Sequence, residues 1–291
     1  MFTIKNIIEK KIELVVVENE EQNTKVVISP NRGSMISELV LAGESLLYLD
    51  KETFFDLNKN VRGGIPILFP ICGALTEHQY NWKNKKYHMD NHGFARNMEW
   101  SIEETSVEEN KAEVTLKLTS TQETLKAYPF SFSVYFTYLI QDNKLTIEQK
   151  YINHSKEEMP FYAGFHPYFK GNHKETSYSI PSTKRFDYHD LQWKLGGNLQ
   201  PDYPINEAQV FTDLKKNSLS FIDIKSKNQI NLSFGLEYKY IAVWSEKEKE
   251  YICVEPWMGL MDEMNKKENL IIIKPDEVID TFFNISIENI R

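Results

Sequence analysis

The chain has 291 residues, 41% of them hydrophobic and 13% aromatic, which is enough apolar material for one large β domain or two ordinary ones. Its formal net charge of −8 argues against nonspecific nucleic-acid binding, which depends on clustered lysine and arginine. No apolar run approaches the roughly 18 residues needed to span a bilayer, and no signal-peptide pattern opens the chain, so we expect a cytoplasmic protein with no membrane partner.

Strand patterns run through the whole chain. Turn residues such as those at 141–144 separate them, and long segments of helical periodicity are missing. The stretch 203–217 fits either a short helix or a loop. Because the strand signal runs from end to end without a linker, we predict an all-β fold, one large antiparallel β-sandwich over 1–291. β-branched and aromatic residues predict strands at 11–19, 25–30, 112–121, 130–140, 144–153, 218–224, 240–245, 251–256 and 282–290.

The stretch RGGIPILFPICGAL, residues 62–75, interrupts this pattern. Two glycines followed by two prolines suit a central strand poorly, whereas Gly63 and Gly64 permit unusual backbone angles or close approach of another group. On this stretch alone, a buried turn with a surface arginine is the preferred interpretation. The alternative places Arg62 at the rim of a pocket, where its planar donors would meet hydroxyl or phosphate oxygens.

The stretch NHGFARNMEW, residues 91–100, holds His92 before a glycine and Arg96 four residues later. A lone histidine is more often a structural residue than a catalytic one. The chain has no His-x-His, no His-Glu-x-x-His and no closely spaced cysteine pair, so the spacing of metal ligands is missing. We therefore predict that the protein needs no metal.

The stretch YAGFHPYF, residues 162–169, places a histidine among aromatic residues. A residue before proline is pushed toward extended backbone, in which His166 and Tyr168 share one face and Phe165 and Phe169 share the other. The imidazole would then face a cavity while the apolar face anchors the segment. The alternative is a core histidine bonded to a backbone carbonyl.

The stretch KEYICVEPWMG, residues 249–259, has a carboxylate in a strongly apolar strand. Alternation puts Cys253, Glu255 and Trp257 on one face. Buried carboxylates are disfavoured without a partner, so Glu255 either lines a cavity or forms a structural salt bridge, and Trp257 offers a flat face on which a sugar ring can stack. Cys72 and Cys253 are too few for a disulfide framework, and we expect both to be buried free thiols.

The ordered set RGGIPILFP, HGFAR, HPYF and CVEPW resembles the aldose 1-epimerase (galactose mutarotase-like) family, including its hexose-6-phosphate epimerase branch. The motifs extend from residue 62 to 257, and β-rich flanks carry the resemblance over essentially the whole chain. The phosphate-specific enzymes more often have threonine after the catalytic histidine. Here Pro167 follows it, as in enzymes that act on free sugars, so the substrate is either a sugar or a sugar phosphate.

The resemblance implies a large β-sandwich with an open groove on one sheet, and a site that uses no cofactor. An aspartate in the 213–223 region is also implied near the sugar hydroxyls. The implied site residues are the acid His166 and the base Glu255, with His92, Arg62, Arg96 and Asp213 near the sugar.

The interconversion of α and β anomers calls for these residue types. A base takes the proton from the C1 hydroxyl while an acid protonates the ring oxygen, and the ring closes again with the roles reversed. Histidine has a suitable pKa unperturbed, and partial burial raises that of glutamate toward it.

Two other classes of protein remain open. A carbohydrate-binding domain without turnover would lack His166 or Glu255, and both are present. A glycoside hydrolase needs two carboxylates that flank the bond, for which Asp213 and Asp223 are poor second candidates.

Overall fold

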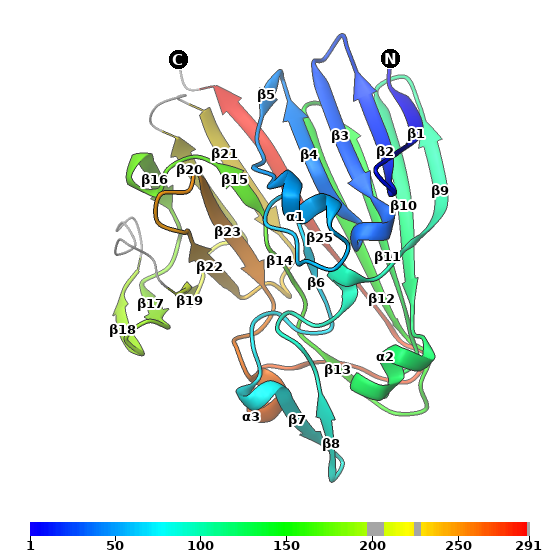
Figure 1. The fold of residues 1–291 in the computed structure, drawn as a ribbon. Helices are drawn as coiled ribbons and strands as arrows, with labels where there is room; N and C mark the ends of the chain where they lie inside the picture. The colour runs from blue at the N-terminus through cyan, green and yellow to red at the C-terminus, as the bar shows by residue number, and fades with distance from the viewer. Residues whose placement is uncertain (197–206, 224–227, 290–291) are drawn as a thin grey trace.

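The computed structural model describes residues 1–196, 207–223 and 228–289, and most of their regular structure is strand (Figure 1). The strands form three main sheets in which neighbours run antiparallel. In chain order, the five-stranded sheet contains β1 (Thr3–Glu9), β2 (Ile12–Asn19), β3 (Thr24–Ser29), β4 (Met35–Leu41) and β5 (Glu44–Ser45). This sheet is blue in Figure 1, and both chain ends lie at the same end of the molecule.

The second sheet, here called the long-strand sheet, combines the middle and the end of the chain. Its strand order is β16 (Thr176–Ser179), β20 (Ser218–Asp223), β21 (Asn228–Phe234), β25 (Val278–Asn289), β12 (Lys144–Asn153), β11 (Phe132–Gln141), β10 (Lys111–Thr119) and β9 (Ser101–Val107). The C-terminal strand enters the centre of this sheet between β21 and β12, so segments far apart in sequence lie side by side (Figure 1).

The third sheet, here called the site sheet, is built from shorter strands. Isolated bridges, such as that between Leu47 and Phe169, join it to the five-stranded sheet. Its order is β18 (Gln192–Leu195), β17 (Lys184–Asp187), β19 (Gln209–Thr212), β22 (Tyr240–Trp244), β23 (Tyr251–Trp257), β14 (Gly164–Phe165) and β6 (Ile67–Leu68), with β15 (Tyr168–Lys170) also paired to β23.

Helices are short, and in the described part of the chain none is long and apolar enough to cross a membrane. Thr121 and Thr124 form a capping box that starts α2. Two two-stranded sheets complete the fold, the hairpin of β7 (Gln79–Trp82) with β8 (Lys85–His88) and the long-range pair of β13 (Met159–Phe161) with β24 (Ile271–Ile273). The helices are α1 (Lys51–Phe55), α2 (Gln122–Ala127) and α3 (Glu263–Lys266), with 3₁₀ turns at Pro30–Arg32, Thr76–His78, Ala95–Asn97 and His173–Glu175.

The main hydrophobic core draws on all three sheets. In β10, Val114 and Leu116 are fully buried, and Thr115 between them is partly exposed. Val17 of the five-stranded sheet and Val254 of the site sheet belong to the same core cluster. Burying each such side chain contributes about 1.5–3 kcal/mol, so the apolar faces hold the sheets together as a sandwich.

The predicted strands are confirmed, with ends shifted by a few residues, although 224 and 290 lie outside the described residues. The interpretation of 203–217 as a short helix or a loop is wrong at 209–212, whereas 213–217 form no helix or strand. Gln209–Thr212 form β19 inside the site sheet, and all four residues are buried. A strand covered on both faces has no polar alternation, which removed the usual signal. Residues 203–206 lie outside the described residues.

Candidate active site

His166 lies between β14 and β15 in the site sheet. Its backbone N–H donates to the carbonyl of Pro66 at 3.1 Å, and its ring stacks on that of Tyr168 with centroids 4.6 Å apart. Phe165 and Phe169 belong to the main core cluster. The expected alternation is confirmed, because the phenylalanines anchor the segment in the core while the imidazole lines a pocket on the other face.

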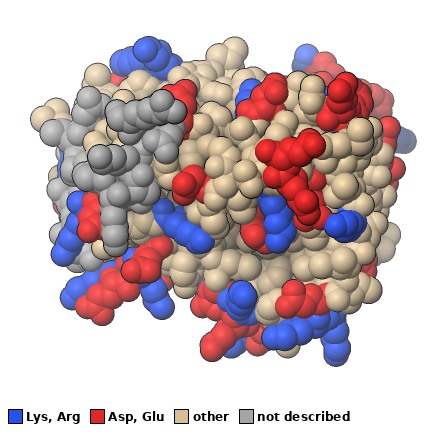
Figure 2. Space-filling view, turned by 90° about the horizontal axis from the view of Figure 1, so that it is seen from above, with Lys and Arg blue, Asp and Glu red and all other residues tan. Residues whose placement is uncertain are grey.

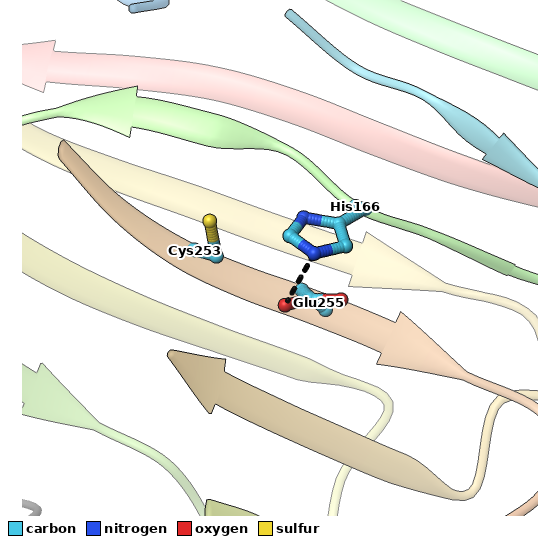
Figure 3. Close-up of side chains that lie close together, drawn as sticks. All are labelled: His166, Cys253 and Glu255. Atoms are coloured by element: carbon cyan, nitrogen blue, oxygen red, sulfur yellow. Dashed lines mark ion pairs between the residues drawn. The ribbon is translucent and has the colours of Figure 1, made fainter. Parts of the chain in front are cut away.

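Glu255 lies on β23 and is only 1% exposed. Its Oε2 accepts a hydrogen bond from Nε1 of Trp257 at 3.1 Å, and its Oε1 lies 3.5 Å from Nε2 of His166 (Figure 3). A separation of 3.5 Å is longer than a normal hydrogen bond. The histidine and the carboxyl group therefore face each other closely without being bonded to each other.

Burial changes the proton affinity of both groups. Desolvation, helped by the positive charges of Arg96 and Arg62, lowers the pKa of His166 to about 3. Desolvation also raises the pKa of Glu255 well above its usual value, although the hydrogen bond from Trp257 opposes this. Both shifts favour the uncharged forms, a neutral imidazole beside a carboxylic acid, which together hold one exchangeable proton. An imidazolium beside a carboxylate holds the same number, so moving that proton converts one form into the other.

His92 lies against this pair, with its ring centroid 5.5 Å from that of His166 and 6.0 Å from that of Trp257. The backbone N–H of Gly73 donates to its Nδ1 at 2.9 Å. Burial, followed by nearby positive groups, lowers its pKa well below the usual value. A neutral imidazole that accepts at Nδ1 carries its proton on Nε2. His92 can therefore only donate a hydrogen bond at Nε2.

The two arginines occupy different positions. Arg62 is exposed at the pocket, with its guanidinium carbon 5.6 Å from the centre of the Trp244 ring. Arg96 is half-buried, and its Nη2 donates to the carbonyl of Asn91 at 2.8 Å. Neither arginine forms an ion pair with an acidic residue in the described part of the chain, although the charge of Asp90 does act on Arg96. Both positive charges reach the acid–base pair, since both lower the pKa of His166.

These side chains surround a pocket of about 230 Å³. The sequence predicted Arg62, His92, His166, Glu255 and Trp257 in one site, and the structure brings these five together. Arg96 does not line the pocket, but its positive charge lowers the pKa of His166. The complete lining is Arg62, Asn91, His92, His166, Glu207, Ala208, Trp244, Glu255, Trp257 and Met261.

A larger hollow of about 770 Å³ lies on the face of the long-strand sheet that points away from the core. Its lining includes Thr115, Thr137 and the surface ion pair of Lys150 with Asp280, whose charged atoms are 3.9 Å apart. It holds no histidine or buried carboxyl group. The volume of a pocket therefore does not identify the active site. The smaller pocket holds the histidine and the buried carboxyl group.

Asp213 is a correction to the sequence-based site. Its carboxylate accepts hydrogen bonds from the hydroxyls of Thr183 at 2.6 Å and Ser182 at 3.0 Å, and it pairs with Lys215 at 3.1 Å. These contacts fix the turn after β19 and keep the carboxylate out of the pocket lining. Among the described residues, Glu207 brings an acidic side chain to the pocket, and sequence reasoning missed it. The side chain of Asp223 lies outside the described part.

Other features of the site agree with the sequence. Cys72 and Cys253 are buried free thiols, as predicted. On the face shown in Figure 2, basic and acidic side chains are interspersed, and no continuous basic patch covers its described part. This distribution fits the acidic net charge.

A family model described as aldose 1-epimerase matches residues 13–286. The chain belongs to the aldose 1-epimerase family. The Slr1438 protein of Synechocystis sp. PCC 6803 is 33% identical, with a TM-score of 0.90 over 95% of this chain and 96% of that one. A galactose mutarotase-like protein from Clostridium acetobutylicum shares the fold, with a TM-score of 0.83 at 21% identity over 99% of both chains. The predicted galactose mutarotase-like β-sandwich is therefore confirmed.

One curated relative in the family has a phosphorylated sugar in its name. A Salmonella typhimurium protein, provisionally named glucose-6-phosphate 1-epimerase, is 26% identical over 42% of this chain and 38% of its own length. The family supports an epimerase, which is an isomerase acting on sugars.

Proposed function

We propose that this family member is a mutarotase that interconverts the α and β anomers of an aldose, with His166 and Glu255 as its acid–base pair. The observation that carries the proposal is the 3.5 Å separation of Nε2 and Oε1 on the wall of a pocket. A histidine and a carboxyl group that face each other on a pocket wall and share one exchangeable proton suit a reaction in which two protons move in opposite directions.

Ring opening needs the proton on His166. Glu255 then takes the proton of the C1 hydroxyl, the bond between C1 and the ring oxygen breaks, and His166 protonates that oxygen. The pair is left as neutral imidazole and carboxylic acid, which is the form that burial favours. After the C1 aldehyde has turned its other face, Glu255 returns a proton to the carbonyl oxygen while His166 takes one from the attacking hydroxyl.

The neighbouring side chains position the sugar. His92 donates from Nε2 to a sugar oxygen, and Trp257 offers its ring face and holds Glu255 through its indole N–H. Each of these steps uses proton transfer or hydrogen bonding by the chain itself, so the mechanism needs no cofactor. An anomer-exchange assay by polarimetry or NMR with glucose and galactose tests the proposal. Exchange no faster than the spontaneous reaction with every aldose and sugar phosphate offered would reject it.

The pH dependence should follow the single shared proton. We expect kcat/KM to stay level as pH falls through 6.5, the ordinary pKa of histidine. The reason is that the pair gains a second proton, on His166, only near pH 3. It should fall as pH rises through the raised pKa of Glu255, where the pair loses its only proton. Initial rates across the pH range, corrected for spontaneous exchange in each buffer, check this. An acidic limb centred near 6.5 would show that His166 titrates like an exposed imidazole.

A hexose 6-phosphate is the second candidate substrate. Arg62 and Arg96 bring two positive charges to the pocket without an acidic partner among the described residues, and a neutral sugar does not require this much charge. A phosphate group would accept charge-assisted hydrogen bonds from Arg62, and the charge of Arg96 would add to its attraction. Pro167, which resembles the free-sugar enzymes, favours the unphosphorylated aldose, and we place that substrate first.

Replacing each arginine separates the two candidates. If phosphate is bound, Arg62→Ala and Arg96→Ala should each lower kcat/KM for glucose 6-phosphate by about 1.5–3 kcal/mol more than for glucose. The measurement is kcat/KM for both sugars with the wild type and each variant. Lys170→Ala is a matched control, because its exposed cation binds Ser45 instead of lining the pocket. Equal losses on both sugars would place the arginines at ring hydroxyls or in structural roles.

A further inference from the structure

Cys253 places a sulfur atom beside the acid–base pair. Its side chain lies on the same face of β23 as that of Glu255 (Figure 3). One ligand atom from each of Cys253, Glu255 and His166 lies within 4.8 Å of the other two. All three residues are buried, with exposed fractions of 0%, 1% and 8%. The proton transfers described above make no use of the thiol.

The three donor atoms match the ligands that zinc prefers. Zn²⁺ binds thiolate sulfur, imidazole nitrogen and carboxylate oxygen, and three protein ligands leave a fourth position for water or another small ligand. Nδ1 of His166 has no hydrogen-bond partner in the described part of the chain, and Nε2 is too far from Glu255 for a normal hydrogen bond. The imidazole is therefore available to a metal ion.

The geometry of the pair also fits a metal ion. Zinc–nitrogen and zinc–oxygen bonds of about 2.0–2.2 Å put neighbouring ligand atoms of a tetrahedral site roughly 3.4 Å apart. Nε2 of His166 and Oε1 of Glu255 are already 3.5 Å apart. The sulfur of Cys253 lies within 4.8 Å of both atoms, so it has further to move than they do. The fourth position faces the pocket that His166 and Glu255 line.

The charges around the three donor atoms decide whether a divalent cation can bind to them. Arg62 and Arg96 are close enough to act on His166, and they oppose a metal ion. A thiolate and a carboxylate together bring two negative charges, which neutralise Zn²⁺ locally. The thiol must lose its proton to bind as a thiolate, so binding releases a proton and affinity should rise with pH.

We propose that His166, Cys253 and Glu255 form a binding site for a thiophilic divalent cation, best matched by Zn²⁺, that silences the acid–base pair while it is bound. Coordination occupies the imidazole lone pair and the carboxylate, so neither can exchange a proton with a sugar. Zn²⁺ and sugar should therefore exclude each other. Metal binding itself is independent of the proposed function, and only the loss of turnover rests on it.

Cobalt reports the ligand set without any activity assay. Co²⁺ titrated into the chelator-treated wild-type protein should give a thiolate-to-cobalt charge-transfer band that saturates at one ion per chain, and Zn²⁺ should abolish that band. Cys253→Ser should lose the band and bind Zn²⁺ more weakly by more than the 10–100-fold that loss of an outer-shell partner costs. It should also keep its basal turnover and resist Zn²⁺ inhibition.

Cys72→Ser is the matched control, because Cys72 is the other buried free cysteine and its Sγ donates to the carbonyl of Gly259 at 3.2 Å. It should keep both the band and the Zn²⁺ affinity. A wild-type protein without a thiolate band overturns the metal site whether or not the variants fold, and so does a band that Cys253→Ser retains. Turnover without a band rejects only the metal site, whereas a band without turnover of any sugar rejects only the mutarotase.

Discussion

Glu255→Gln should reduce kcat for anomer exchange by about 10²–10⁴-fold, and His166→Ala should do the same, because each removes one member of the acid–base pair. The double variant should be little slower than either single variant, since one group cannot complete the proton exchange without the other. Glutamine keeps the shape of the side chain, and its amide oxygen can still accept from Nε1 of Trp257. Polarimetric or NMR exchange rates, corrected for the spontaneous reaction, measure the effect.

Glu263→Gln is the matched control for this loss. Glu263 is also 1% exposed, but it lies on α3, outside the pocket lining, and its Oε1 accepts the backbone N–H groups of Glu268 and Asn269. Its replacement should lower the free energy of unfolding and leave kcat near that of the wild type. If both His166→Ala and Glu255→Gln keep most of their activity while folded, a different pair of groups carries the reaction.

Gly93→Ala should cause the largest loss of stability among single-methyl changes near the site. Gly93 has a φ of 69°, and a Cβ added there would overlap the carbonyl oxygen of Phe69. That oxygen already accepts the backbone N–H groups of Phe94 and Ala95. Left-handed strain and overpacking each cost on the order of 1–3 kcal/mol. His92 is the preceding residue, so the shift should also disturb the pocket.

Gly43→Ala separates these two costs. Gly43 has a φ of 84°, but the nearest atom to an added Cβ is Cβ of Asn23 at 3.7 Å, which is ordinary contact. Only the backbone strain should appear there. The free energy of unfolding from urea titrations of the wild type and both variants provides the comparison. Equal losses at the two positions would show that the approach of Phe69 to Gly93 relaxes without cost.

Strands with one face in the core could be predicted from sequence because their burial alternates. In β10 the buried residues fall at every second position, so the pattern alone gives the strand and its inner face. The strands of the site sheet have a weaker sequence pattern, because β6 and β14 have two residues each and β19 is buried throughout. Their existence depends on long-range pairing that no local pattern records.

The same distinction explains the site. His166 and Glu255 could be predicted to line a cavity because each stands in an alternating apolar segment with a chemically unusual side chain. Asp213 could not be placed, because the groups that hold it, Ser182 and Thr183, lie about 30 residues away in sequence. Trp244 reaches the pocket because its strand, β22, pairs with β23, which places Trp244 opposite Cys253.

The single proton held between His166 and Glu255 has a consequence for the catalytic cycle. After a full passage from one anomer to the other, the proposed steps return both groups to their starting protonation state. The protein therefore needs no recharging by buffer or solvent between turnovers, and the passage from α to β and the passage from β to α begin with the same form of the protein. Both residues are at least nine-tenths buried, and the cycle loses nothing by this limited contact with solvent.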